Sequence, residues 1–170
     1  MTLSRMDWAA MAAVAMLLPA DPASSQQHVF VGAGPNVGLW DVADGRHVVG
    51  LYTIAMLHLG SDRRRASVRL DASYGRFWAS GDVGNEDYSV LTFLANMVVT
   101  FRQDSDERPY WTLGVGYDTS SDDTPDGSGP TIGTGIGLRV GWGIVEARFD
   151  LAHTLGGLAA YVPIFAAIGF

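Results

Sequence analysis

The sequence has no cysteine and, after its first 25 residues, no long apolar run. Without cysteine, no disulfide can hold the fold and no thiol chemistry is available. No segment beyond residue 25 reaches the roughly 18 uninterrupted apolar residues of a helical membrane span, so such a span is excluded there. Lysine and arginine are also scarce, 11 against 18 acidic residues, and the net charge of -7 argues against a nucleic-acid partner, whose phosphates require a basic surface.

The first 25 residues have the three-part layout of a secretory signal peptide. A basic residue, Arg5, precedes an apolar run over residues 8–18, and small residues follow. The alternative, a membrane anchor, needs about 20 apolar residues, which this run does not supply. We therefore predict a cleaved signal peptide over residues 1–25, with cleavage near Gln26, and one domain over residues 26–170.

The rest of the chain divides into eight segments separated by connections rich in glycine, aspartate and proline. This pattern is typical of a β-meander. A membrane protein without helical spans must be a closed barrel, because unpaired backbone groups are not tolerated in lipid. We therefore predict an all-β, eight-stranded antiparallel up-and-down transmembrane β-barrel, which is the smallest size of that kind. The predicted strands cover residues 28–39, 47–59, 66–78, 88–101, 110–118, 131–142, 144–153 and 158–170.

Large apolar residues alternate with glycine or charged residues in segments 110–118, 131–142 and 144–153. A period of two places each set on one face of a strand. A face of glycine and charge suits the interior of a narrow membrane barrel. The alternative is an exported soluble barrel, lipocalin-like, whose apolar face would point inward around a lipophilic ligand. Segments 47–59 and 88–101 are apolar on both faces, so their facing stays open.

The charged residues on the glycine-rich face are predicted to form a network inside the barrel. Counting across a turn near residues 142–143 puts Arg139 opposite Glu146. Segments 66–78 and 144–153 lie across an eight-stranded barrel from each other, and buried charges must be paired. A barrel of this size has room only for its own side chains, so a packed plug is favoured over a narrow pore. The network comprises Arg69, Asp71, Arg139, Glu146, Arg148 and Asp150.

Aromatic residues gather near the predicted strand ends, as expected for two belts at the headgroup levels of a membrane. With the first strand starting in the periplasm, the outer belt comprises Trp40, Trp78, Tyr88, Tyr117 and Tyr161. The periplasmic belt comprises Phe101, Tyr110, Trp111, Trp142 and Phe170.

The last segment carries an apolar row at every second position and ends on an aromatic residue. Its members include Val162, Ile164, Ile168 and Phe170. This resembles the closing strand of bacterial outer-membrane barrels, whose final Phe and alternating apolar residues are read by the barrel-assembly machinery. Residues 26–170 resemble the small eight-stranded barrels, the family of outer-membrane protein X and the barrel domain of outer-membrane protein A.

The resemblance implies a monomer in the bacterial outer membrane, among its lipids and lipopolysaccharide. It implies a structural, envelope-stabilising or surface-contact role. The predicted outer loops are acidic, and we hypothesise that divalent ions bridge them to lipopolysaccharide phosphates; association that survives chelation would refute this. The acidic residues are Asp41, Asp44, Asp82, Glu86, Asp118, Asp122, Asp123 and Asp126.

Apparent motifs for chemistry are weak. The glycines of residues 133–137 do not open a helix, and strand alternation accounts for them. Residues 122–133 echo a calcium loop but end in Gly133 instead of glutamate. A lipid A-modifying hydrolase would need an exposed Ser and His with an orienting carboxylate, whereas His153 is followed by Thr154, with Asp150 upstream. The other histidines lack metal-ligand spacing. We therefore predict no catalytic, cofactor or metal site.

Overall fold

The computed structural model describes residues 27–40, 46–60, 65–78, 87–102, 105–120, 128–154 and 157–170. The predicted signal peptide, residues 1–25, lies outside the described residues. Among those described, no helix is long and apolar enough to cross a membrane.

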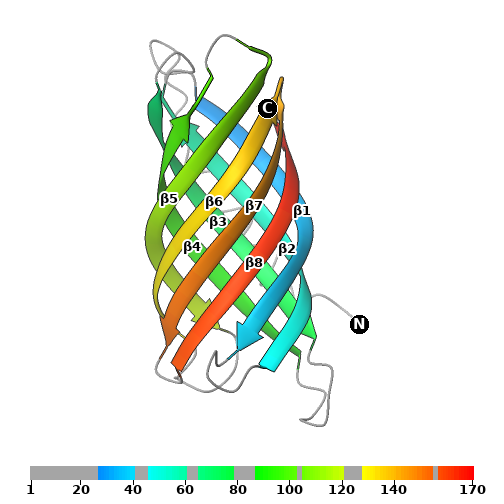
Figure 1. The fold of residues 1–170 in the computed structure, drawn as a ribbon. Helices are drawn as coiled ribbons and strands as arrows, with labels where there is room; N and C mark the ends of the chain where they lie inside the picture. The colour runs from blue at the N-terminus through cyan, green and yellow to red at the C-terminus, as the bar shows by residue number, and fades with distance from the viewer. Residues whose placement is uncertain are drawn as a thin grey trace.

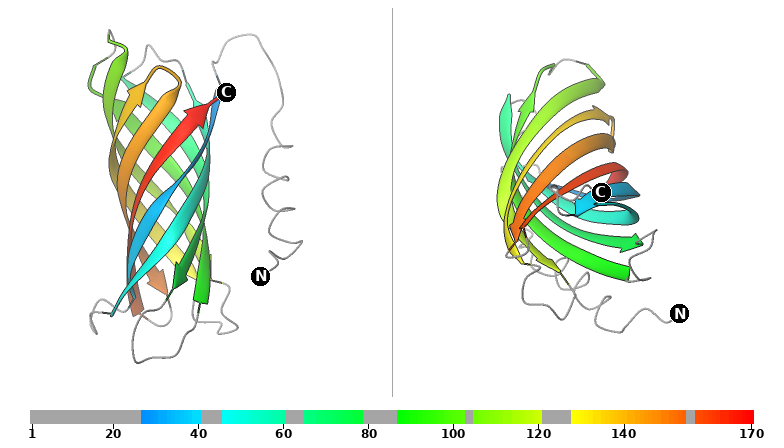
Figure 2. Two further views of the ribbon diagram at one scale, coloured as in Figure 1. Left: turned by 90° about the vertical axis from the view of Figure 1, so that its right-hand side faces the viewer. Right: turned by 60° about the horizontal axis from the view of Figure 1, so that its bottom comes forward.

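Eight antiparallel strands form one closed barrel, in which each strand pairs with its sequence neighbours and β8 pairs with β1 (Figures 1 and 2). The predicted fold class is therefore confirmed. The C-terminus and the β6–β7 turn lie at the same end of the barrel, called here the C-terminal end (Figure 2). The strands are β1 (Gln27–Trp40), β2 (Arg46–Leu59), β3 (Ala66–Trp78), β4 (Asp87–Thr100), β5 (Glu107–Ser120), β6 (Gly129–Val140), β7 (Gly143–Thr154) and β8 (Gly157–Gly169).

The turn between β6 and β7 lies one residue earlier than the sequence analysis placed it. β6 ends at Val140, and Gly141 takes the positive φ of 57° that a tight hairpin requires. Glycine adopts this conformation without a steric penalty. The register of this hairpin consequently pairs Arg139 with Ile144, not with Glu146.

The exterior of the barrel is apolar. Large side chains stand exposed around its circumference, among them Val115 at 63%, Ile136 at 68% and Trp142 at 72% exposure. The glycines that alternate with these residues in β6, Gly133 and Gly135, are buried. This arrangement is the reverse of a soluble barrel and matches a transmembrane one.

The interior combines apolar and polar side chains. Strands β2 and β4, whose facing the sequence left open, both place apolar residues inside, such as Ile54, Met56 and Leu94. They also expose apolar residues on the outside, such as Leu51 and Phe93. Because both faces of these strands are apolar, alternation alone could not distinguish the interior face from the lipid face.

Candidate functional site: a charge network across the barrel interior

Four charged residues meet inside the barrel from opposite walls. Arg69 and Asp71 stand two positions apart on β3, and Glu146 and Arg148 stand two positions apart on β7. Residues two apart on a strand point to the same face, so each strand supplies one cation and one anion to the interior. β3 and β7 are four strands apart in the ring of eight, which makes the contact between them a cross-lumen one.

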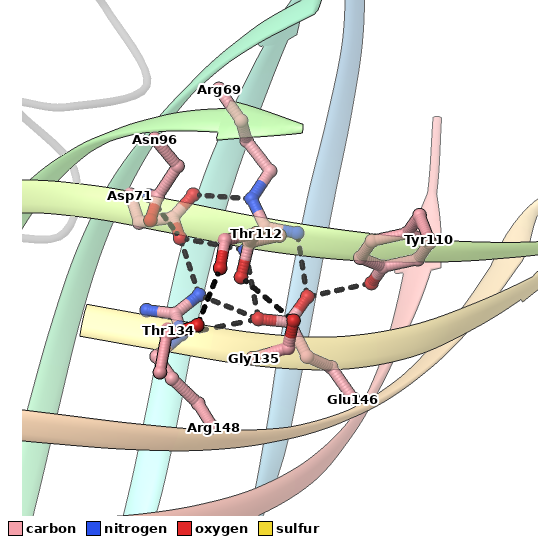
Figure 3. Close-up of polar contacts among 9 residues, drawn as sticks. All are labelled: Arg69, Asp71, Asn96, Tyr110, Thr112, Thr134, Gly135, Glu146 and Arg148. Atoms are coloured by element: carbon pink, nitrogen blue, oxygen red, sulfur yellow. Dashed lines mark hydrogen bonds and ion pairs between the residues drawn. The ribbon is translucent and has the colours of Figure 1, made fainter. Parts of the chain in front are cut away.

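Arg69 binds two carboxylates at once. Its Nε donates to Asp71 Oδ1 at 2.8 Å and its Nη2 donates to Asp71 Oδ2 at 3.0 Å. Towards the opposite wall, Nη1 donates to Glu146 Oε2 at 2.7 Å and Nη2 donates to Glu146 Oε1 at 2.9 Å. The fixed fork of the guanidinium thus bridges the lumen through paired hydrogen bonds (Figure 3).

Arg148 completes the square from the other side. Its Nη2 donates to Asp71 Oδ2 at 2.5 Å and to Glu146 Oε1 at 2.9 Å, and its Nε donates to Glu146 Oε1 at 3.1 Å. All four side chains are at most 1% exposed. Each carboxylate therefore touches both guanidinium groups, and the four charges sum to zero.

Neutral side chains on β4 and β5 extend the network. The Tyr110 hydroxyl donates to Glu146 Oε2 at 2.6 Å, and Asn96 Nδ2 donates to Asp71 Oδ2 at 2.9 Å (Figure 3). The Arg69 guanidinium lies 5.9 Å from the centre of the Tyr110 ring. The sequence analysis did not include Tyr110 or Asn96 in the network, although both lie on inward-facing positions of their strands.

Glycines on the inward face provide room for these side chains. A Cβ atom on Gly137 would collide with the ring of Tyr110, and one on Gly114 would collide with the amide of Asn96. An eight-stranded barrel is narrow, so a large side chain from one wall requires a small residue on the neighbouring strand. The glycines of β5 and β6 therefore allow the charged and aromatic side chains to fill the lumen.

Two residues predicted for the network lie elsewhere in the barrel. Arg139 is opposite Ile144, near the C-terminal end, where its guanidinium lies 5.4 Å from the centre of the Phe30 ring. Asp150 is buried inside, two positions beyond Arg148, and its Oδ1 has no hydrogen-bond partner. Of the six predicted residues, the structure thus joins Arg69, Asp71, Glu146 and Arg148 through direct bonds.

The predicted aromatic belts are wrong at two positions. Tyr110 and Tyr161 are each only 5% exposed and point into the barrel. Both share the parity of inward residues on their strands, Thr112 on β5 and Phe165 on β8, and the prediction used position along the strand without that parity.

The other described belt residues lie on the exterior. Trp78, Phe101, Tyr117, Trp142 and Phe170 are exposed. Trp111 is half-buried, and its Nε1 donates to the hydroxyl of Thr134 at 2.9 Å. The side chains of Trp40 and Tyr88 lie outside the described part of the structure.

The predicted assembly row of β8 lies on the exterior. Ile164, Ile168 and Phe170 are exposed by 50%, 56% and 82%, and Val162 is half-buried. Recognition of this row by an assembly machinery stays a prediction.

Of the eight acidic residues predicted for the outer loops, the structure describes only Asp118, and there the prediction is wrong. Asp118 is 1% exposed and faces the interior, so it does not belong to an acidic rim. Its parity matches Thr112 and Gly114 on β5, which also face inward. The other seven acidic residues lie outside the described residues, as do residues 122–127, the first half of the segment that echoes a calcium loop.

The hydrolase arrangement is not assembled around His153. His153 is exposed on β7 and pairs with Leu158, whereas Asp150 is buried inside and cannot orient an outward imidazole. The Thr154 side chain lies outside the described residues. His28 and His58 are neighbours in register, but the described residues contain no group of three or more potential metal ligands.

No protein-family model matches the sequence, and no curated protein matches it. The fold, in contrast, matches solved outer-membrane structures. Neisserial surface protein A superposes with a TM-score of 0.62 and 12% identity, over 87% of this chain and 100% of its own. The outer membrane enzyme PagL gives a TM-score of 0.58 and 16% identity, over 83% and 98%.

A third similar structure is Ail, the attachment invasion locus protein of Yersinia pestis, solved with the heparin analogue sucrose octasulfate. It superposes with a TM-score of 0.57 and 12% identity, over 87% of this chain and 100% of its own. The chain thus has the fold of small eight-stranded outer-membrane barrels. At these identities the likeness establishes the fold alone, and the three neighbours differ in what they do.

Proposed function

We propose that this chain is a small integral protein of the bacterial outer membrane that stabilises the envelope and does not conduct solutes. The charge network carries the proposal, because its four buried side chains bridge β3 and β7 through the middle of the lumen. Buried charges that are each paired with an opposite charge form a barrier to ions, which would have to break these pairs in order to pass.

Short connections support a structural role over a surface-contact role. Away from the C-terminal end, the strands are joined by residues 41–45, 79–86, 121–128 and 155–156 only. Binding sites usually lie on loops carried by a rigid scaffold, and these connections, at most eight residues long, are short for that purpose. An enzymatic role lacks support from the described residues, because His153 and Asp150 point to opposite faces of β7.

The membrane lipids and lipopolysaccharide are the proposed partners of the apolar exterior, and the assembly machinery is the proposed partner of β8. Recovery of the expressed protein in the outer-membrane fraction, with faster gel mobility before heating than after, would support this location. Recovery in the soluble periplasm would contradict it.

Conductance across planar lipid bilayers tests the closed lumen. The wild-type protein is expected to give no sustained conductance. The double variant Arg69→Ala, Arg148→Ala removes both guanidinium groups from the lumen and is expected to introduce small conducting events. The matched control Arg65→Ala changes an exposed arginine next to β3 and should behave as wild type. Sustained conductance of the wild type would contradict the proposal.

A further inference from the structure

The half of the barrel away from the C-terminal end contains a second polar region, next to the charge network, in which Asp150 lies two positions beyond Arg148 on the inward face of β7. A cavity of about 10 Å³ lies between Asn36 of β1, Tyr52 of β2, Thr92 of β4 and Asp150 of β7. Phe77 and Tyr161 also line it. A cavity of this size holds a single particle about as large as a water molecule.

Three oxygen atoms of the residues lining this cavity have no hydrogen-bond partner. They are Asp150 Oδ1, Asn36 Oδ1 and the hydroxyl oxygen of Tyr52. The three residues are buried, with 3%, 2% and 3% exposure. Buried polar atoms are paired in the great majority of cases, because an unpaired one loses its hydration without compensation. The three unpartnered oxygens therefore point to a bound particle that several oxygen atoms can coordinate at once.

The charge balance of the interior indicates the sign of that ligand. Arg69 and Arg148 are already balanced by Asp71 and Glu146, with which they form four short ion pairs. Asp150 and Asp118 are buried in addition, so the interior holds two buried arginines and four buried carboxylates. Arg148 Nη1 is a buried donor without a partner, two positions from Asp150 on β7, but its single charge is already shared by Asp71 and Glu146. An uncompensated buried carboxylate is strongly unfavourable, so the region requires additional positive charge.

We propose that the cavity binds one monovalent cation of about the size of sodium, held by the oxygens of Asp150, Asn36 and Tyr52. A water molecule would fit but would leave the charge of Asp150 unbalanced. A proton on Asp150 would also balance the charge, and its O–H would be a donor for a neighbouring oxygen; a midpoint that depends on pH and not on sodium is the result that this alternative predicts, and it would overturn the proposal. A calcium ion takes about six to eight oxygens, commonly from several carboxylates, and the cavity lining offers a single carboxylate.

Thermal unfolding in detergent, with sodium chloride replaced by choline chloride at constant ionic strength, tests this site. Choline is too large for the cavity. Sodium is expected to raise the midpoint by about 5–10 °C at a hundredfold excess over Kd, and the effect should saturate. Asp150→Asn keeps the shape of the side chain but removes its charge, and is expected to abolish the sodium-dependent shift. The control Asp106→Asn changes an exposed carboxylate near the C-terminal end and should retain the shift.

Sodium-23 NMR of the wild-type protein gives a second readout that does not depend on any variant. Saturable line broadening that lithium or potassium competes away is expected. Equal midpoints in sodium and choline, or a sodium shift that persists in Asp150→Asn, would overturn the proposal. If Asp150→Asn does not fold, the wild-type sodium-23 spectra test the proposal alone. The absence of saturable broadening in those spectra would overturn the proposal.

Discussion

Replacing Arg69 with alanine is expected to lower the free energy of unfolding by about 3–5 kcal/mol. The substitution removes four hydrogen bonds and leaves Asp71 and Glu146 with Arg148 as their remaining arginine partner. Most of the loss comes from the buried carboxylate charge that stays behind. Urea titration of the protein folded in lipid vesicles, followed by tryptophan fluorescence, measures the change.

Two further variants separate the charge effect from loss of packing. Arg65→Ala removes an exposed arginine near the same strand and should lie within about 0.5 kcal/mol of wild type. Arg69→Met combined with Glu146→Leu removes one charge of each sign and leaves Arg148 paired with Asp71. This double variant is expected to be more stable than Arg69→Ala, since replacing a whole buried pair by apolar residues is often nearly neutral. A free energy of unfolding for Arg69→Ala equal to that of the wild type would contradict a stabilising role for the charge network.

Placing an arginine on the lipid face is expected to have the second large effect. Val115 is 63% exposed near the middle of β5, and Val115→Arg should cost about 2–4 kcal/mol, because the charge would lie near the bilayer midplane. Val140 is 50% exposed at the C-terminal end of β6, and Val140→Arg should cost about 0–1 kcal/mol. The same urea titration measures both, and equal costs at the two depths would contradict a membrane-embedded exterior.

The eight-stranded barrel was predictable from the sequence because residues 26–170 divide into eight strand-length segments and because several of these segments alternate between two kinds of residue. Alternation in β5, β6 and β7 distinguishes an apolar face from a face of glycine and charge, and a membrane allows only one such orientation of the faces. The same reasoning could not orient β2 or β4, where Leu51 and Ile54 or Phe93 and Leu94 are apolar on opposite faces. There, pairing with neighbouring strands determines the facing.

The sequence predicts which side of the barrel wall a charged side chain lies on better than it predicts which residue that side chain pairs with. Placing the β6–β7 turn one residue late moves the partner of Arg139 by two residues, from Ile144 to Glu146, without changing which face either residue is on. The sequence cannot tell which of several nearby glycines takes the positive φ. The bond between Arg69 and Glu146 likewise depends on the relative heights of β3 and β7, which follow from the register of all the intervening strands.

Residues Tyr110, Tyr161 and Asp118 show a different limit, since their parity was visible in the sequence. Tyr110 and Asp118 share the parity of Thr112 on β5, Tyr161 shares that of Phe165 on β8, and all three lie inside the barrel. Their position near a strand end predicts the opposite placement and is the weaker signal. In a narrow barrel the pleat determines the facing of a side chain up to the last paired residue.

Spin labelling along β5 tests the central claim, an apolar exterior around a polar, filled interior, most directly. The chain has no cysteine, so single cysteines at residues 113, 115 and 117, whose side chains face outward, can each be labelled without background. Folded in lipid vesicles, these labels are expected to be accessible to lipid-dissolved oxygen and shielded from a water-soluble nickel chelate, whereas a label at the exposed residue 106, just before β5, is expected to meet the chelate. Labels at 113, 115 and 117 that meet the chelate as readily as the label at 106 would contradict the account.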